Sequence, residues 1–131
     1  MMKPFLGFFF LVLMLLMSCS KDENPNTLTA PAGCDTLTLI YSYSNDIKPI
    51  IGTNCAGSTC HIEGTGNYDF TTYEVLADRI RSGKFEYRLL LPVTDAQHMP
   101  QAGTPSYKGI SLNPCDLYKI LSWIKQGYRN N

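Results

Sequence analysis

Two cysteines and a histidine stand close together near the middle of the 131-residue chain. Cys55 and Cys60 are separated by four small residues, and His61 follows directly. Two thiols can add to the two vinyl groups of haem, and a histidine after the second cysteine can then bind the iron; the usual spacer is two residues. A spacer of Ala, Gly, Ser and Thr can bulge without displacing either thiol. The cluster therefore predicts one haem c, bound covalently at Cys55 and Cys60, with His61 as an iron ligand.

Two other interpretations of this cluster stay open on the residues alone. Cys55 and Cys60 could form a disulfide beside an unrelated His61, as an oxidising compartment would allow. Zinc could instead be bound by Cys55, Cys60, His61 and His98, which are common zinc ligands. The adjacency of Cys60 and His61 makes that geometry awkward, and no second pair of closely spaced cysteines follows.

A haem held in this way needs a sixth ligand, and His98 and Met99 are the candidates. A lone Met usually fills a gap in a core, but Met99 lies in a polar segment and precedes Pro100. Pro100 restricts the backbone of Met99 to an extended conformation, and a thioether needs no deprotonation to bind iron. We predict Met99 as the second axial ligand, with His98 near the haem edge or in solvent.

A helix is expected to lead into the cysteine cluster. Isoleucines within residues 47–51 recur at helical spacing, and Ser44 or Asn45 can cap a helix that runs into Cys55. Upstream, residues 36–41 are β-prone but short, and we expect them to form an extended arm.

Two further helices are predicted after the cluster. Thr71–Glu74 has the pattern of a capping box, and the helix that it opens should stop at Gly83. A short helix over residues 85–91 should end before Pro92.

The last third of the chain divides into a loop and a helix. Residues 93–112 contain two Pro, two Gly and no helical periodicity, and a loop of that length is usually functional. Asn113 can cap a final helix that has Pro114 at its first position and Gly127 at its end.

The chain from Ser44 to Gly127 resembles class I cytochromes c, particularly the small cytochrome c domains of Bacteroidota lipoproteins. The resemblance covers about two-thirds of the chain. It is carried, in order, by the helix into Cys-Cys-His, by Asp69–Tyr73 opening a helix, by Met99-Pro100 and by Ile120–Gly127. It implies an all-α, cytochrome c-like fold, with three to four helices around one covalently bound haem and the first and last helices crossing beside it.

The resemblance also implies the ligand set and one departure from it. Cys55 and Cys60 would bind the haem, and His61 and Met99 would be the axial ligands. Many class I cytochromes orient the proximal imidazole with a Pro carbonyl, but no Pro lies between His61 and Pro92. Another backbone carbonyl is therefore expected to accept the imidazole N–H.

With both axial positions filled by protein, no iron site is open to a substrate. The predicted function is outer-sphere electron transfer with unidentified redox protein partners, and the chain is not expected to be an enzyme. Two alternatives remain: a peroxidase-like or sensor-like protein in which Met99 dissociates to leave five-coordinate iron, and a structural surface lipoprotein stapled by disulfides and lacking haem.

The N-terminus is expected to be a targeting segment. Phe5–Met17 is a thirteen-residue apolar run after Lys3, too short to span a bilayer comfortably but suited to a signal peptide. Leu16–Cys19 resembles a bacterial lipobox, although Met17 is an imperfect match. We predict a signal peptide at residues 1–18, lipidation of Cys19 and a flexible tether over residues 19–33; the alternative is an ordinary signal peptide. The expected location is the cell envelope, as an outer-membrane lipoprotein facing the periplasm or the cell surface.

The predicted domain, residues 34–131, contains two further cysteines. If Cys19 carries lipid and the central pair carries haem, Cys34 and Cys115 remain, and we predict a disulfide between them; the alternative is two buried free thiols. The length allows one small domain. Lys plus Arg and Asp plus Glu number 11 each, so no net positive field favours nucleic acid as a partner.

Overall fold

The computed structural model describes residues 28–35, 40–57, 60–102 and 109–131. Within these ranges the chain forms four α-helices, one π-helix and no strand, which confirms the all-α class. Gln101 and Gly109 form an isolated antiparallel bridge. In chain order the helices are η2 (Tyr43–Ile47, the π-helix), α2 (Lys48–Asn54), α3 (Tyr73–Arg81), α4 (Lys84–Leu90) and α5 (Pro114–Lys125).

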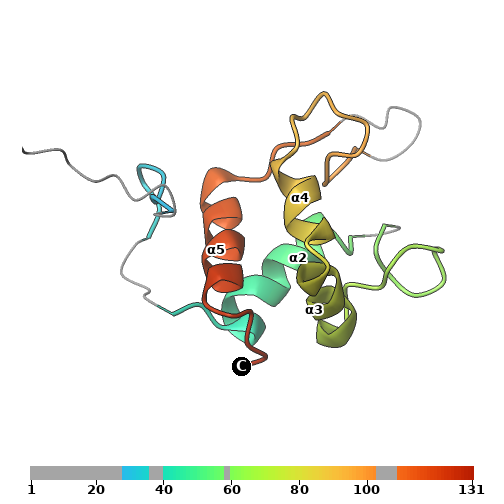
Figure 1. Cartoon of the computed structure of the whole chain (residues 1–131), viewed down its shortest axis with the longest axis horizontal. Coiled ribbons are helices and arrows are strands. Elements are labelled where there is room, and N and C mark those ends of the chain that lie inside the picture. Colours follow the sequence, from blue (N-terminus) through green and yellow to red (C-terminus); the bar gives the residue numbers. More distant parts are fainter. Residues whose placement is uncertain (1–27, 36–39, 58–59, 103–108) are drawn as a thin grey trace, which may run out of the picture.

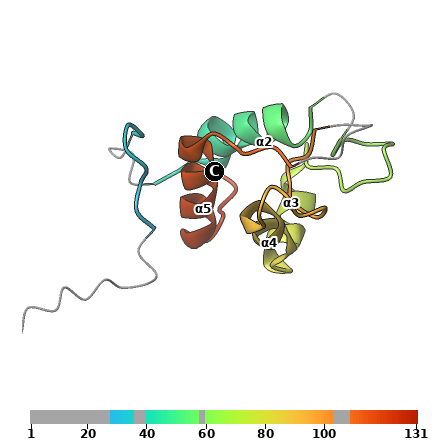
Figure 2. The same ribbon diagram turned by 90° about the horizontal axis from the view of Figure 1, so that it is seen from above.

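The helices pack around one core. η2 continues into α2, η2 also packs against α5, and α3 packs against α4. Figures 1 and 2 show α2 running across the molecule, with α5 beside one of its ends and α3 and α4 beside the other. The largest fully buried side chains come from η2, α2, α3 and α5, so the apolar faces of these helices meet in the centre: Ile47, Ile51, Leu76, Ile120 and Trp123.

The first helical segment begins earlier than the sequence predicted. Ser42, rather than Ser44 or Asn45, is the N-cap: its hydroxyl accepts the Asn45 N–H at 3.3 Å. The Asp46 carboxylate in turn accepts the Ser42 N–H at 2.8 Å. This reciprocal pair satisfies two backbone donors that a helix start leaves without intrahelical partners.

The predicted capping box at Thr71 is wrong. The N-cap of α3 is Thr72, and it makes no side-chain capping bond. The Thr71 hydroxyl and N–H instead donate to the carboxylate of Asp69 at 2.6 and 2.8 Å. A short acidic side chain two residues upstream thus competes with the helix for the Thr71 donors.

The other helices lie close to their predicted limits, although α4 begins and ends one residue earlier than predicted. Gly83 follows α3 with a φ of 72°, a left-handed conformation that glycine adopts without strain. α4 ends at Leu90, before Pro92. Asn113 caps α5 by accepting the Cys115 N–H at 2.8 Å, and Pro114 is the first residue of that helix.

The predicted disulfide between Cys34 and Cys115 is confirmed. The two Cα atoms lie 5.3 Å apart, and the residues are separated by 81 positions. The bond joins the segment before η2 to the first turn of α5. In the chain-entropy account, a closed loop of this length stabilises a domain by about 4 kcal/mol.

Several predictions on the N-terminal part lie outside the described residues. These are the signal peptide, Cys19 and residues 36–39 of the arm. The described part of the tether, residues 28–33, contains no helix or strand. At the end of the arm, Tyr41 is buried, and its N–H donates to the Gln126 side chain at 3.0 Å. None of the described helices is long and apolar enough to cross a membrane.

Candidate functional site

A cavity of about 690 Å³ lies beside the C-terminal end of α2, bounded also by the loop that follows α2, by α4 and by residues 99–102. The four residues predicted to hold a haem all line this cavity: Cys55, Cys60, His61 and Met99. Its apolar wall comes from Phe70, Phe85 and Leu89. Cys55, Cys60 and His61 lie far from Met99 in the sequence, yet all four line the same cavity.

The two cysteines are held by the end of α2 and by the turn after it. Cys55 is the C-cap of α2, and its N–H donates to the Ile51 carbonyl at 2.9 Å. The Cys55 carbonyl accepts the His61 N–H at 3.1 Å, which closes the loop and brings His61 back beside Cys55. Both Cys55 and Cys60 have free thiols, so the alternative of a disulfide between them is not the observed arrangement. Burial, with a smaller effect of neighbouring Cys60, raises the pKa of Cys55 to about 12.

The imidazole of His61 is fixed on two sides. Its Nδ1 lies 2.9 Å from the Tyr68 carbonyl oxygen. Because a carbonyl can only accept, Nδ1 carries the proton and Nε2 keeps its lone pair. The ring also stacks on Phe70, with centroids 4.2 Å apart and planes inclined by 10°. The Tyr68 carbonyl is the acceptor that the sequence led us to expect but did not identify.

The charge state of His61 also suits a metal ligand. Burial lowers its pKa, and the charge of Arg88 acts in the same direction. The hydrogen bond to Tyr68 opposes part of this shift. The neutral imidazole is the form that binds metal, and a second partner on Nδ1 is the usual support of such a ligand.

Met99 is presented to the cavity by a loop with no regular structure. Its N–H donates to the Arg88 carbonyl at 3.0 Å, which ties the loop to α4. The next peptide bond, to Pro100, is cis. The Pro100 carbonyl accepts the Ile110 N–H at 2.9 Å. The Met99 side chain is half-buried and lines the cavity.

The expected position of His98 is wrong. His98 is only 5% exposed and does not line the cavity. Its ring nitrogens face the Leu91 and Ile110 carbonyl oxygens. Within the described ranges, no three His, Cys, Asp or Glu residues are grouped to hold a metal, so the four zinc ligands considered from the sequence do not come together.

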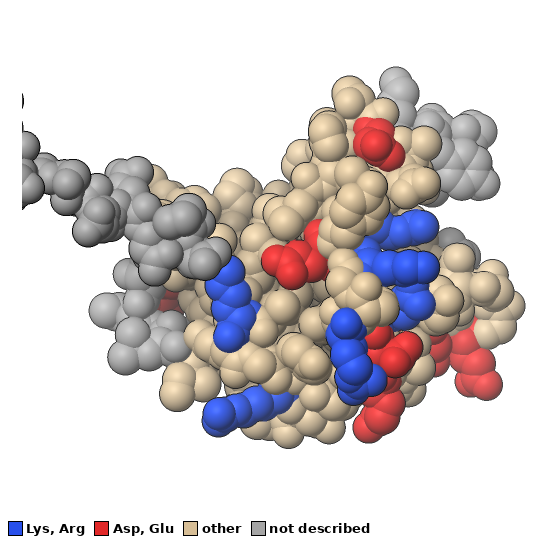
Figure 3. Space-filling view, in the orientation of Figure 1, with Lys and Arg blue, Asp and Glu red and all other residues tan. Residues whose placement is uncertain are grey.

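Three basic side chains, Arg79, Lys84 and Arg88, also line the cavity. In the view of Figure 3, basic side chains gather to the right of the centre, in the part of the molecule that α3 and α4 form. The ion pair between Asp78 and Arg81 involves none of the three. Arg79, Lys84 and Arg88 therefore bring positive charge to the cavity.

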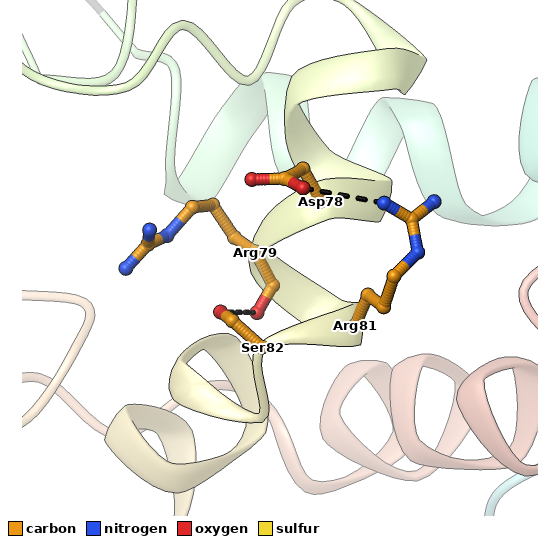
Figure 4. Close-up of polar contacts among 4 residues, drawn as sticks. All are labelled: Asp78, Arg79, Arg81 and Ser82. Atoms are coloured by element: carbon orange, nitrogen blue, oxygen red, sulfur yellow. Dashed lines mark hydrogen bonds and ion pairs between the residues drawn. The ribbon is translucent and has the colours of Figure 1, made fainter.

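Figure 4 shows how α3 separates two arginines. Arg81 reaches Asp78 at 3.2 Å, and both side chains are largely exposed. Arg79 points to the opposite side of the helix from that pair. Its guanidinium lies 4.0 Å from the centroid of the Tyr68 ring, an attractive cation–π arrangement. Arg79 is thus held at the cavity by an aromatic face, whereas Arg81 is a surface residue.

Comparison of the chain with family models, curated proteins and solved structures gives no match. The groups that line the cavity suit a haem. Two free thiols, an imidazole and a thioether could bind it, and an apolar wall and three basic side chains surround the same space.

Sequence reasoning missed three parts of this site. The Tyr68 acceptor and the position of His98 depend on backbone carbonyls, which leave no signature in a sequence. The cations left a weak signal: Lys84 and Arg88 are four residues apart and so share one face of a helix.

Proposed function

We propose that the chain is a c-type cytochrome that carries one haem c. Cys55 and Cys60 hold the haem through thioether bonds, and His61 and Met99 are its axial ligands. The observation that carries the proposal is that these four residues, chosen from the sequence for this chemistry, line one cavity.

The attachment is a balanced addition. Each thiol S–H adds across one vinyl double bond, so that sulfur binds one vinyl carbon and hydrogen the other, and no oxidant is needed. Haem carries two carboxylate groups, and Arg79, Lys84 and Arg88 supply the positive charge that can pair with them. Phe70 and Phe85, which line the cavity, would help to exclude water from a bound haem.

The bound haem supplies reversible one-electron oxidation and reduction of its iron. A thioether ligand and an apolar enclosure both favour the reduced state and raise the potential. Because His61 and Met99 would fill both axial positions, the proposed role is an electron carrier for redox protein partners rather than an enzyme.

Carbon monoxide tests this role. A six-coordinate electron carrier should show the same visible spectrum, reduced, with and without carbon monoxide. A peroxidase-like or sensor-like protein with five-coordinate iron would bind the gas at once, and its absorption maxima would shift. That shift in the wild-type protein would contradict the electron-carrier role.

We also propose that Cys19 is lipidated and anchors the protein in the cell envelope, as an outer-membrane lipoprotein. The support is the lipobox-like Leu16–Cys19 after the apolar run. Cys19→Ala should release the protein from membranes or leave the precursor uncleaved. Mature Cys19→Ala protein recovered in the membrane fraction would contradict lipidation.

A further inference from the structure

His98 is a buried, ionisable side chain that is only 5% exposed. Its Nδ1 lies 2.6 Å from the Leu91 carbonyl oxygen, and its Nε2 lies 3.2 Å from the Ile110 carbonyl oxygen. Leu91 is the residue directly after α4, and Ile110 precedes the segment that leads to α5. One imidazole thus contacts both ends of the loop that contains Met99.

The backbone packs tightly against the His98 side chain. The His98 N–H donates to the Asp95 carbonyl at 3.1 Å, so backbone and ring are both held. A Cβ atom added at Gly109 would lie 2.6 Å from Cδ2 of His98 and 2.5 Å from the Val93 carbonyl oxygen. No real side chain fits at those distances, so the close approach of this backbone to the imidazole requires glycine at position 109.

We propose that His98 is a positioning residue that links Leu91 to Ile110 and so holds Met99 at the cavity. This inference rests on the proposed function, because it concerns the ligand role of Met99. His98 is not itself a ligand, since both of its ring nitrogens face carbonyl oxygens of the loop. Because Met99 is the next residue, the contacts of His98 restrain the backbone that presents the Met99 side chain to the cavity.

The proposal predicts how easily an external ligand displaces Met99. Added imidazole should bind the ferric haem protein only when the loop opens, and the weak sulfur-to-iron absorption band near the red end of the spectrum should then disappear. The imidazole concentration that removes half of the band therefore reports loop opening. His98→Phe keeps a ring but removes the ring nitrogens that contact the Leu91 and Ile110 carbonyl oxygens, and that concentration should fall about tenfold, as expected when about one net hydrogen bond is lost.

Two further variants keep the test informative. His98→Gln retains N–H donors, so its midpoint should lie between those of wild type and His98→Phe. Gly109→Ala leaves His98 intact but forces it to move, and should also lower the midpoint. Thr94→Ala, at an exposed position of the same loop, is the matched control and should equal wild type.

The outcomes separate this proposal from the proposed function. A wild-type protein that attaches no haem, or lacks the sulfur-to-iron band, contradicts the ligand set and not the loop closure. The role of His98 is overturned if His98→Gln and Gly109→Ala attach haem but lose half of the sulfur-to-iron band at the same imidazole concentration as wild type. This result would count even if His98→Phe does not fold. Equal midpoints for His98→Phe and wild type overturn it as well.

Discussion

The two sides of the cavity hold their candidate ligands by different means. His61 is fixed locally, by a carbonyl seven residues away and by a stacked Phe70, in a loop that begins at the end of α2. Met99 lies in a loop without regular structure, and the contact of His98 with Ile110 spans twelve residues. The His61 side is thus continuous with a helix, whereas the Met99 side depends on closure of a loop.

This difference indicates which side should open first. Local opening begins where few apolar contacts and few regular hydrogen bonds hold the chain. His61 packs on a phenyl ring that itself contacts Phe85 in the core. Met99 depends on hydrogen bonds between backbone and His98 and on one bond to Arg88. We therefore expect the Met99 side to exchange ligands while the His61 side stays bound.

Removal of Met99 should have the largest effect. Met99→Ala removes the thioether, so the sulfur-to-iron band should vanish and the potential should fall by a substantial part of the about 0.8 V range that axial ligands control. Haem attachment should remain, because Cys55, Cys60 and His61 are unchanged. Potentiometry and the ferric spectrum measure both effects. A variant that keeps the band would show that another residue is the ligand.

Loss of the disulfide should weaken the domain without altering either ligand. Replacing both Cys34 and Cys115 by Ser should lower the free energy of unfolding by about 2–4 kcal/mol, because the unfolded chain regains the freedom that the closed loop removes. Urea unfolding of the haem protein measures this loss. The sulfur-to-iron band should be unchanged at low urea; its disappearance there would mean that the disulfide also supports the Met99 side.

Phe70→Leu tests the firmness of the His61 side. The change removes the ring stacked on His61 and the edge contact with Phe85, at a cost of about 1–3 kcal/mol. His61 should still bind iron, because its bond to Tyr68 does not involve the Phe70 side chain. Urea unfolding gives the stability, and the reduced spectrum with carbon monoxide tests ligation. New carbon monoxide binding in Phe70→Leu would show that the His61 side is the weaker one.

The smallest effect is expected from one cavity cation. Arg79→Gln removes a positive charge beside the cavity, so the reduced state loses stabilisation and the potential should fall modestly. Arg81→Gln is the matched control on the same helix, because Arg81 points away from Arg79 and pairs with Asp78. Equal reduction potentials for Arg79→Gln and wild type would show that the Arg79 charge does not affect the haem.

The sequence predicted those features whose causes are local. Asn113 and Pro114 define the start of α5, and Gly83 follows the end of α3, because each acts on the backbone within a few residues of itself. The capping box predicted at Thr71 is wrong because the Thr71 N–H and hydroxyl donate to the Asp69 carboxylate. A pattern of residue types does not reveal which of two nearby acceptors a donor will choose.

The site shows the same division. Cysteine spacing and the Met-Pro pair identified residues that meet at one cavity. His98 was predicted near the haem edge or in solvent once Met99 was chosen as the ligand, and that prediction was wrong. In the structure its two ring nitrogens face two carbonyl oxygens of its own loop. Only the closed path of the backbone creates that environment, and no local sequence signal describes it.

The most direct test of the account is covalent haem attachment. The full chain should be expressed together with a haem-attachment system, denatured, and examined by haem staining on a gel and by intact mass. The wild-type protein should give a stained band whose mass is increased by one haem, and a variant with both Cys55 and Cys60 replaced by Ser should attach none. A wild-type protein that folds under these conditions but is colourless and has no added mass would contradict the central claim, and would favour a structural lipoprotein held by its disulfide.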